Sequence, residues 1–185
     1  MDFITRARAI VGSANLLTGA DTTRYASDWT GNYRAEPLCV VRPANTAQVS
    51  ALMALANETV TPVVPIGGNT GVNGGAQAPG AVLLSLERLN RIREIRSAAR
   101  VAVVEAGVVL ERLHEATAPD GLTFPMTFGA KGSATLGGMM STNAGGSGVL
   151  RYGNTRALVL GVEAVMPDGA VLDLMTALHK DNSGY

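Results

Sequence analysis

The sequence predicts an α+β fold in which two lobes share a cleft. Three observations support this prediction: a strand–helix–strand unit in the first half, a β-hairpin in the last quarter, and two glycine clusters between well-formed apolar segments. The chain has 185 residues, which suits one domain or two small lobes. Hydrophobic residues make up 46% of it, so it can build a core and is not expected to be disordered.

The elements expected in the first half are a helix over residues 2–11, a strand over 38–41, a helix from about 46 onward and a strand over 62–66. Asn45 or Thr46 is a suitable N-cap for the second helix, whose apolar residues recur at helical spacing. The strand after it is a continuous branched apolar run, which is typical of a buried strand, and it leads directly into Gly67.

The elements expected in the second half are strands over 81–86, 92–96 and 101–106, a helix over 108–117, a short helix from about 134, and strands over 157–166 and 170–174. Pro167, Asp168 and Gly169 are turn residues between the last two strands, which predicts an antiparallel hairpin. We therefore divide the chain into an N-terminal helical segment, residues 1–36, and two lobes, residues 37–107 and 108–185.

The charge balance argues against nucleic acid as a partner. Lys and Arg together number 15, as do Asp and Glu, so no long-range positive field exists to attract a polyanion. Any bound anion must be held by local groups, chiefly backbone N–H. No apolar run approaches the ~18 residues of a membrane-spanning helix, and no signal segment is recognisable, so we expect a soluble, cytoplasmic protein.

Metal binding is not expected. Cys39 is the only cysteine and lies in an apolar run, where it is interpreted as a small buried residue. The two histidines, His114 and His179, are far apart and lack a partner at ligand spacing.

Glycine is concentrated in two short regions. Six of the 22 glycines lie within residues 67–80 and seven within 129–148, where an even distribution would place roughly four in total. The first cluster reads PIGGNTGVNGGA. Gly67 and Gly68 allow positive φ and a close approach to a ligand, Asn69 tolerates left-handed geometry, and Thr70 adds a hydroxyl. Consecutive N–H groups in such a turn form an anion-binding nest, which suits a pyrophosphate.

The second cluster reads GAKGSATLGGMMSTNAGGSG. Ser133 is a candidate cap for a short helix beginning near Ala134, and the free N–H groups of that helix would form a second anion site. Lys131 can add positive charge, although a solvated lysine is the simpler interpretation. Neither cluster contains a P-loop pattern or a Rossmann G-x-G-x-x-G, so these two nucleotide folds are not predicted.

The ordered motifs VVRP, PIGGNTG, EAG, SATLGG, TNAGG and RYG resemble the FAD-binding domain (PCMH-type) of the vanillyl-alcohol oxidase superfamily. Within it, GAKGS, LRYGNTRALVLGVEAVMPDG, KDNSGY and the N-terminal DWTGNYR are similar to the D-2-hydroxyglutarate dehydrogenase and D-lactate dehydrogenase group. The resemblance runs from about Asp28 to Tyr185.

The resemblance implies FAD held between the two lobes, with the adenine end near Val165. The residues it implies at the cofactor are Ile66, Gly67, Gly68, Asn69, Thr70, Gly71, Pro125, Ala134, Thr135, Gly137, Gly138, Ser141, Asn143 and Val165. Some members attach flavin through a histidine after the paired glycines. Asn69 occupies that position here and lacks the nucleophilic nitrogen, so noncovalent FAD is predicted.

The resemblance further implies a dehydrogenase in which flavin N5 accepts a hydride from C2 of a small D-2-hydroxy acid, followed by reoxidation by a protein or quinone acceptor. The family's catalytic residues reside in a C-terminal cap, and this chain is expected to be a fragment without it, so no catalytic residue is assigned. A homodimer is compatible with the sequence. The alternatives are a catalytically silent FAD-binding module, another FAD-linked oxidase of the superfamily, and a non-flavin interaction domain with structural glycine turns.

Overall fold

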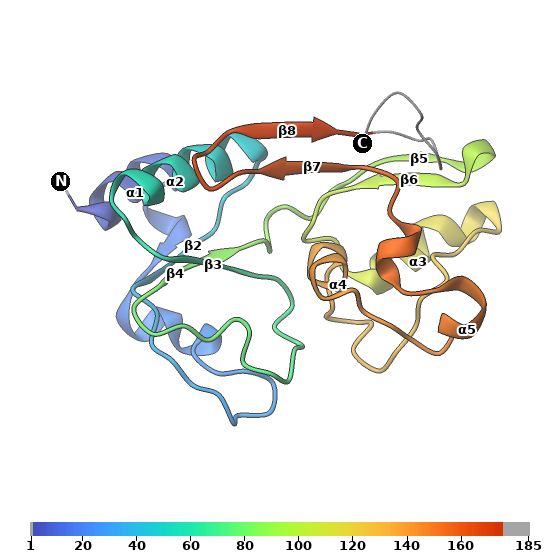
Figure 1. Cartoon of the computed structure of the whole chain (residues 1–185), viewed down its shortest axis with the longest axis horizontal. Coiled ribbons are helices and arrows are strands. Elements are labelled where there is room, and N and C mark those ends of the chain that lie inside the picture. Colours follow the sequence, from blue (N-terminus) through green and yellow to red (C-terminus); the bar gives the residue numbers. More distant parts are fainter. Residues whose placement is uncertain (1, 176–185) are drawn as a thin grey trace.

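The computed structural model describes residues 2–175, and Figure 1 shows their arrangement in two lobes. The helices are α1 (Phe3–Val11), α2 (Thr46–Glu58), α3 (Leu110–Thr117), α4 (Leu136–Thr142) and α5 (Val149–Tyr152). The strands are β1 (Leu16–Leu17), β2 (Cys39–Val41), β3 (Val63–Ile66), β4 (Val82–Ser85), β5 (Ile92–Arg96), β6 (Val101–Val104), β7 (Val162–Val165) and β8 (Val171–Leu174). The motif KDNSGY and His179 lie outside the described residues. The predicted limits of the lobes stay a prediction.

The first lobe is built on a four-stranded sheet with the order β1-β2-β4-β3. β2 and β3 both pair in parallel with β4, whereas β1 pairs antiparallel with β2. The carboxyl ends of the three parallel strands therefore meet at one edge of the sheet. Gly67 follows β3 at this edge, which is where open α/β sheets place their ligands.

The two faces of this sheet have separate cores because side chains alternate along each strand. Cys39, Val41 and Leu84 pack against the apolar faces of α1 and α2. Val40 and Leu83 point to the opposite face and pack with Ile66 and Tyr25.

The predicted Asn45 cap of α2 is confirmed. Its side chain accepts a hydrogen bond from the backbone N–H of Gln48 at 2.9 Å. This bond satisfies one of the free donors of the first turn and fixes where the helix begins.

The predicted hairpin of β7 and β8 is also confirmed, with Val162 opposite Leu174 and Val165 opposite Val171. Its turn lies on α2, as Figure 1 shows. Ser50 Oγ donates to the carbonyl of Gly169 at 2.6 Å, and a Cβ on Gly169 would lie 2.7 Å from the carbonyl oxygen of Ser50. The hairpin thus packs closely onto the helix that covers the first sheet.

Two predicted elements have different bounds in the structure. The strand expected over 157–166 begins only at Val162, because residues 155–158 form a 3₁₀ turn in which Thr155 donates twice to the carbonyl of Ala144. The helix expected from residue 108 begins at Leu110, because Val109 is extended and forms an antiparallel bridge with Thr135. In both cases a contact with a distant segment overrides the local strand or helix propensity.

Candidate functional site

The fold brings the two glycine clusters into direct contact. A methyl group on Gly67 would overlap Thr135 Oγ1, and one on Gly68 would lie 2.7 Å from the carbonyl carbon of Ser133. Real Cβ contacts are essentially never shorter than 3.0 Å, so only glycine permits this approach. The two loops predicted to share an anion therefore lie against each other.

The expectation that Gly68 needs positive φ is wrong. Neither Gly67 nor Gly68 has positive φ; the first left-handed residue of the loop is Asn69, with φ of 50°, followed by Gly74 at 66°. The tolerance of Asn69 for this geometry is confirmed. Position 68 must be glycine because the Ser133 carbonyl on the other loop leaves no room for a Cβ, whereas Asn69 makes the bend.

The first loop presents a series of unpaired donors. The backbone N–H groups of residues 68–73 donate no hydrogen bond to any other described residue. By contrast, the N–H of Gln77 donates to Gly74 at 3.0 Å and the N–H of Gly80 to Glu36 at 2.9 Å. Gly68 and residues 71–73 are exposed, so these N–H groups are open to water or to a bound anion, and a run of such donors suits an anion-binding nest.

The second cluster departs from its predicted arrangement. The N-cap of α4 is Thr135 rather than Ser133, and it makes no side-chain cap bond. The N–H groups of Leu136 and Gly137 are not free, because they donate to the carbonyls of Val108 at 2.9 Å and of Ala106 at 2.8 Å. The start of α4 thus joins it to the segment after β6, and of the free N–H groups predicted for its first turn only that of Gly138 is free of a partner among the described residues.

One buried hydroxyl at the junction lacks a partner. Thr135 is 6% exposed, and its Oγ1 makes no hydrogen bond within the described part of the chain. It lies beside Gly67 and Gly138, whose N–H also donates to no described residue. An unsatisfied buried hydroxyl costs about 1–3 kcal/mol, which a bound polar group near this junction would reduce.

A cavity of about 590 Å³ lies between the lobes. It is bordered by Pro65 of β3, Leu84 of β4, Met140 of α4 and Val165 of β7, and it has the size of a typical cofactor site. The predicted residue Gly137 also borders it. Most of these side chains are apolar, which suits a flat aromatic ring better than a phosphate.

Charged residues are placed at the wall of this cavity. Glu105 is 4% exposed and accepts hydrogen bonds from the backbone and guanidinium of Arg91 at 2.9–3.0 Å. Arg93 lies 3.5 Å from Glu105 and 3.5 Å from Glu163, and Glu163 also accepts a hydrogen bond from Thr46. Glu163 of β7 is thereby linked to β5 and to the first turn of α2 at the wall of the cavity.

Burial alone would raise the pKa of the Glu105 carboxyl. The hydrogen bonds from Arg91 and the charges of Arg91 and Arg93 outweigh burial and hold this pKa below its ordinary value. Glu105 therefore remains ionised as part of the ion-pair network and is not available as a proton donor at neutral pH.

The remaining predicted residues lie around the second loop. Pro125 is half-buried, and its carbonyl would lie 3.1 Å from a Cβ on Gly148. Ser141 is exposed and donates to the carbonyl of Gly137 at 2.8 Å. Asn143 has φ of 52° and accepts from the N–H of Arg156 at 3.0 Å, so it shapes the loop.

Two further candidates behave differently. The N–H of Ala134 donates to Ala130 at 2.8 Å and is not free. Lys131 is an exposed cation, and its Nζ lies 3.0 Å from Glu111, whose side chain is similarly exposed, rather than at the loop junction.

Sequence reasoning missed the residues that hold the first loop. Asn69 Nδ2 donates to the carbonyl of Ser27 at 2.7 Å, and Asn69 Oδ1 accepts from Gln77 at 3.4 Å. A Cβ on Gly74 would lie 2.6 Å from the ring of Tyr33. The aromatic residues in the polar segment before β2, such as Tyr33, were the available sequence signal for these contacts. The residues that this segment contacts lie about 40 positions further along the chain, so the sequence does not identify them.

Within residues 2–175, no group of three or more His, Cys, Asp or Glu is placed to hold a metal ion. The same residues include no helix long and apolar enough to cross a membrane.

The chain was compared with known families and curated proteins. A family model described as an FAD binding domain matches residues 37–175. The chain is 44% identical over 167 residues to D-2-hydroxyglutarate dehydrogenase of Xanthomonas citri pv. viticola, covering 90% of this chain and 35% of the relative. It is 43% identical over 152 residues to D-lactate dehydrogenase of Archaeoglobus fulgidus, covering 82% and 34%. The chain thus spans about a third of the length of these relatives.

Solved structures confirm the predicted fold class. Alkyldihydroxyacetonephosphate synthase superposes with a TM-score of 0.82 at 19% identity, over 94% of this chain and 38% of that one. p-Cresol methylhydroxylase superposes with a TM-score of 0.75 at 24% identity, over 92% and 34%.

Proposed function

We propose that this chain, which belongs to the family of FAD-binding domains, holds FAD noncovalently as the cofactor part of a flavin-dependent D-2-hydroxy-acid dehydrogenase. Family membership confirms the resemblance and the cofactor on which the proposal depends. The observation that carries the proposed mode of binding is the run of unpaired N–H groups over residues 68–73, on a loop in contact with the second glycine cluster.

The chain's own residues have a binding and positioning role. The N–H groups of residues 68–73 would donate to the pyrophosphate, and Thr135 and Gly138 supply further donors at the junction of the loops. Hydrogen bonds to a charged group contribute about 1.5–3 kcal/mol each, so three or four can hold a diphosphate without a lysine. Gly137 and Val165 would border an aromatic ring of the cofactor in the cavity between the lobes.

When bound, FAD supplies a flavin N5 that accepts a hydride from C2 of the hydroxy acid. The apolar wall of the cavity, including Leu84 and Met140, would exclude water from the part of the cofactor it encloses. His114 is not proposed as the base, because it does not border the cavity; its Nε2 is hydrogen-bonded to the carbonyl of Phe124 at 2.9 Å. A catalytic base and the substrate's carboxylate partner are proposed to lie in the cap domain expected from the resemblance.

Noncovalent attachment is supported by the surroundings of Asn69. Both ends of its amide are engaged, with Ser27 and with Gln77. An amide nitrogen is not a nucleophile toward the flavin, so no bond to the ring is expected at this position.

The substrate class rests on the relatives, which are named dehydrogenases of D-2-hydroxyglutarate and D-lactate. A small 2-hydroxy acid is therefore the proposed substrate, with a protein or quinone as electron acceptor. We further propose a cytoplasmic location and a homodimer; the relatives from Bos taurus and rice are named mitochondrial.

The proposal is tested by reconstituting the purified chain with FAD and removing unbound flavin. The expected result is a flavin spectrum on the folded protein and full release of flavin into the supernatant after acid precipitation. Flavin that remains in the precipitate would contradict noncovalent attachment. A chain that retains no flavin would contradict the function itself.

A second candidate is a catalytically silent FAD-binding module. It is favoured by the cavity wall, where the two bordering carboxylates, Glu105 and Glu163, are both held in ion pairs with arginines. Turnover of D-2-hydroxyglutarate or D-lactate with an artificial electron acceptor distinguishes the two. FAD binding without turnover supports the silent module, whereas turnover supports the dehydrogenase.

A further inference from the structure

A compact turn precedes β2 and lies against the first glycine loop, residues 67–80, which we call the FAD loop. Residues 26 and 35 are joined by a backbone hydrogen bond of 2.9 Å, and the N–H of Asp28 donates to the carbonyl of Tyr33 at 3.0 Å. Asp28 is 6% exposed, and its carboxylate accepts from Thr30 Oγ1 at 2.7 Å and from the N–H of Tyr33 at 3.3 Å. A buried carboxylate therefore closes this turn, which we call the 26–35 turn.

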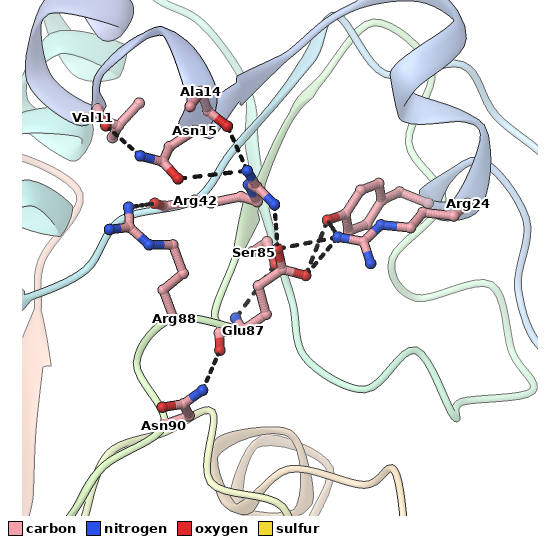
Figure 2. A network of polar contacts seen from close by, with 10 residues as sticks. Val11, Ala14, Asn15, Arg24, Arg42, Ser85, Glu87, Arg88 and Asn90 are labelled. Carbon is pink, nitrogen blue, oxygen red and sulfur yellow. Dashed lines mark hydrogen bonds and ion pairs between the residues drawn. The ribbon is translucent and has the colours of Figure 1, made fainter.

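The start of the 26–35 turn is anchored to the edge of the sheet. Arg24 Nη2 and the hydroxyl of Tyr25 donate to Glu87 Oε2 at 2.8 and 3.1 Å, and Arg42 Nη1 donates to Glu87 Oε1 at 3.0 Å. Figure 2 shows Glu87 between Arg42 and Arg24. Because Arg42 directly follows β2 and Glu87 lies two residues after the end of β4, the turn begins at a fixed point beside the carboxyl ends of these strands.

The 26–35 turn and the residue that follows it contact the FAD loop at three points along its length. The carbonyl of Ser27 accepts from Asn69 Nδ2 at 2.7 Å at the start of the loop. The ring of Tyr33 packs against Gly74 in its middle, and the carbonyl of Glu36 accepts from the N–H of Gly80 at its end. Of the unpaired N–H groups of residues 68–73, those of residues 70–73 lie between the first two of these points.

We infer that the 26–35 turn positions the FAD loop, with Asn69 and Tyr33 as positioning residues that hold the N–H groups of residues 68–73 in the arrangement the pyrophosphate requires. A glycine-rich loop is flexible when free, and ordering it costs free energy at the moment of binding. Contacts that order the loop beforehand lower this cost. The inference rests on the proposed function, because it assigns a role toward the same FAD.

The first test compares Asn69→Gly with Asn73→Gly. Glycine readily adopts the φ of 50° found at residue 69, so Asn69→Gly removes the bond to Ser27 while leaving the bend accessible. Asn73→Gly adds the same flexibility to the same loop at an exposed position that makes no side-chain hydrogen bond to a described residue. We expect Asn69→Gly to raise the Kd for FAD by roughly three- to tenfold more than Asn73→Gly does.

The affinity is measured through Trp29, which is the only tryptophan of the chain and lies on the 26–35 turn with 76% of its surface exposed. Energy transfer to bound flavin quenches its emission, so a titration gives Kd without any catalytic assay. If the wild-type chain binds FAD and the Asn69→Gly and Asn73→Gly variants have the same Kd, the inference is overturned. If the wild-type chain does not bind FAD, the proposed function is contradicted, and the inference that depends on it is contradicted as well.

The second test is a double-mutant cycle between Tyr33 and Gly74. Gly74→Ala places a Cβ 2.6 Å from the Tyr33 ring at a φ of 66°, and it should weaken FAD binding about tenfold or more. In a Tyr33→Ala background the overlap disappears, so the same substitution should cost several-fold less. Gly75→Ala, with no atom within 4 Å, and Tyr33→Phe, which keeps the ring, should bind FAD like the wild type.

Additive effects of Tyr33→Ala and Gly74→Ala on Kd would overturn the role of this contact. A loss of affinity in Tyr33→Phe would also contradict it, because the contact uses only the Cβ and ring carbons.

Discussion

Gly68→Ala is the substitution whose effect follows most directly from the structure. Gly68 does not have positive φ, so alanine introduces no backbone strain. Its Cβ would nevertheless lie 2.7 Å from the carbonyl carbon of Ser133, closer than the 3.0 Å limit of real contacts. The backbone of one loop must therefore move away from the other, since no flexible side chain is available to yield.

The expected cost is that of overpacking a close contact, about 1–3 kcal/mol in the free energy of unfolding. For a chain of this size it corresponds to a decrease in Tm of roughly 2–12 °C. Displacing the N–H group of residue 68 should also remove at least one charge-assisted hydrogen bond to FAD, which raises Kd by about tenfold or more.

Thermal unfolding followed by circular dichroism, together with FAD titration, provides the assay. Gly71→Ala is the matched control for stability, because it lies in the same loop with no atom within 4 Å of the added Cβ and without positive φ. Its Tm should stay within about 1–2 °C of the wild type. A Gly68→Ala variant with wild-type Tm and wild-type Kd would refute the close contact between the loops.

Three further predictions follow. Gly71→Ala should weaken FAD binding several-fold while leaving Tm unchanged, because the space beside Gly71 is open to a ligand; equal FAD titrations for variant and wild type would argue against contact there. Glu105→Gln should destabilise the fold by about 1.5–3 kcal/mol, measured by urea unfolding at pH 7, since Arg91 and Arg93 lose their charged partner. The folded-state pKa of Glu105 lies below its ordinary 4.5, so this contribution is complete above about pH 4.5 and is lost as the pH falls through the folded pKa; a variant and wild type with the same acid-unfolding profile would contradict it. Burial raises the pKa of the Cys39 thiol to about 11, so a disulfide reagent at pH 8 should modify it only after denaturation, and rapid labelling of the native chain would show that β2 is not buried as described.

The parts of the fold that could be predicted from the sequence are those set by local chemistry. Asn45 before an apolar repeat specified where α2 begins, and Pro167, Asp168 and Gly169 specified the turn of the β7–β8 hairpin. In each case the signal and its structural partner lie within a few residues of each other. The antiparallel register then follows from the short loop.

The parts that could not be predicted depend on contacts between distant segments. The cap of α4 is Thr135 and not Ser133, because Thr135 is held extended by its bridge to Val109. The strand expected from residue 157 begins later, because Thr155 is bound to Ala144. Local helix and strand propensities carry no information on either contact, because the partners are distant along the chain.

The candidate site shows the same division. A glycine at position 68 has two possible physical causes, a positive φ or a neighbour too close for a Cβ, and the sequence looks the same in both cases. Only the position of Ser133 on the other loop distinguishes them. The predicted donors over residues 68–73 have no partner in the described part of the chain, whereas the N–H groups of Leu136 and Gly137 at the start of α4 donate to carbonyls of the segment after β6.

The central claim is that the glycine loops bind the cofactor through its pyrophosphate. Parallel titrations of the chain with FAD and with riboflavin, which has the same ring but no phosphate, test it most directly. The account predicts saturable binding of FAD and an affinity for riboflavin at least about a hundredfold weaker, as expected for the loss of two or more hydrogen bonds to a charged group. Equal affinities for FAD and riboflavin would contradict it.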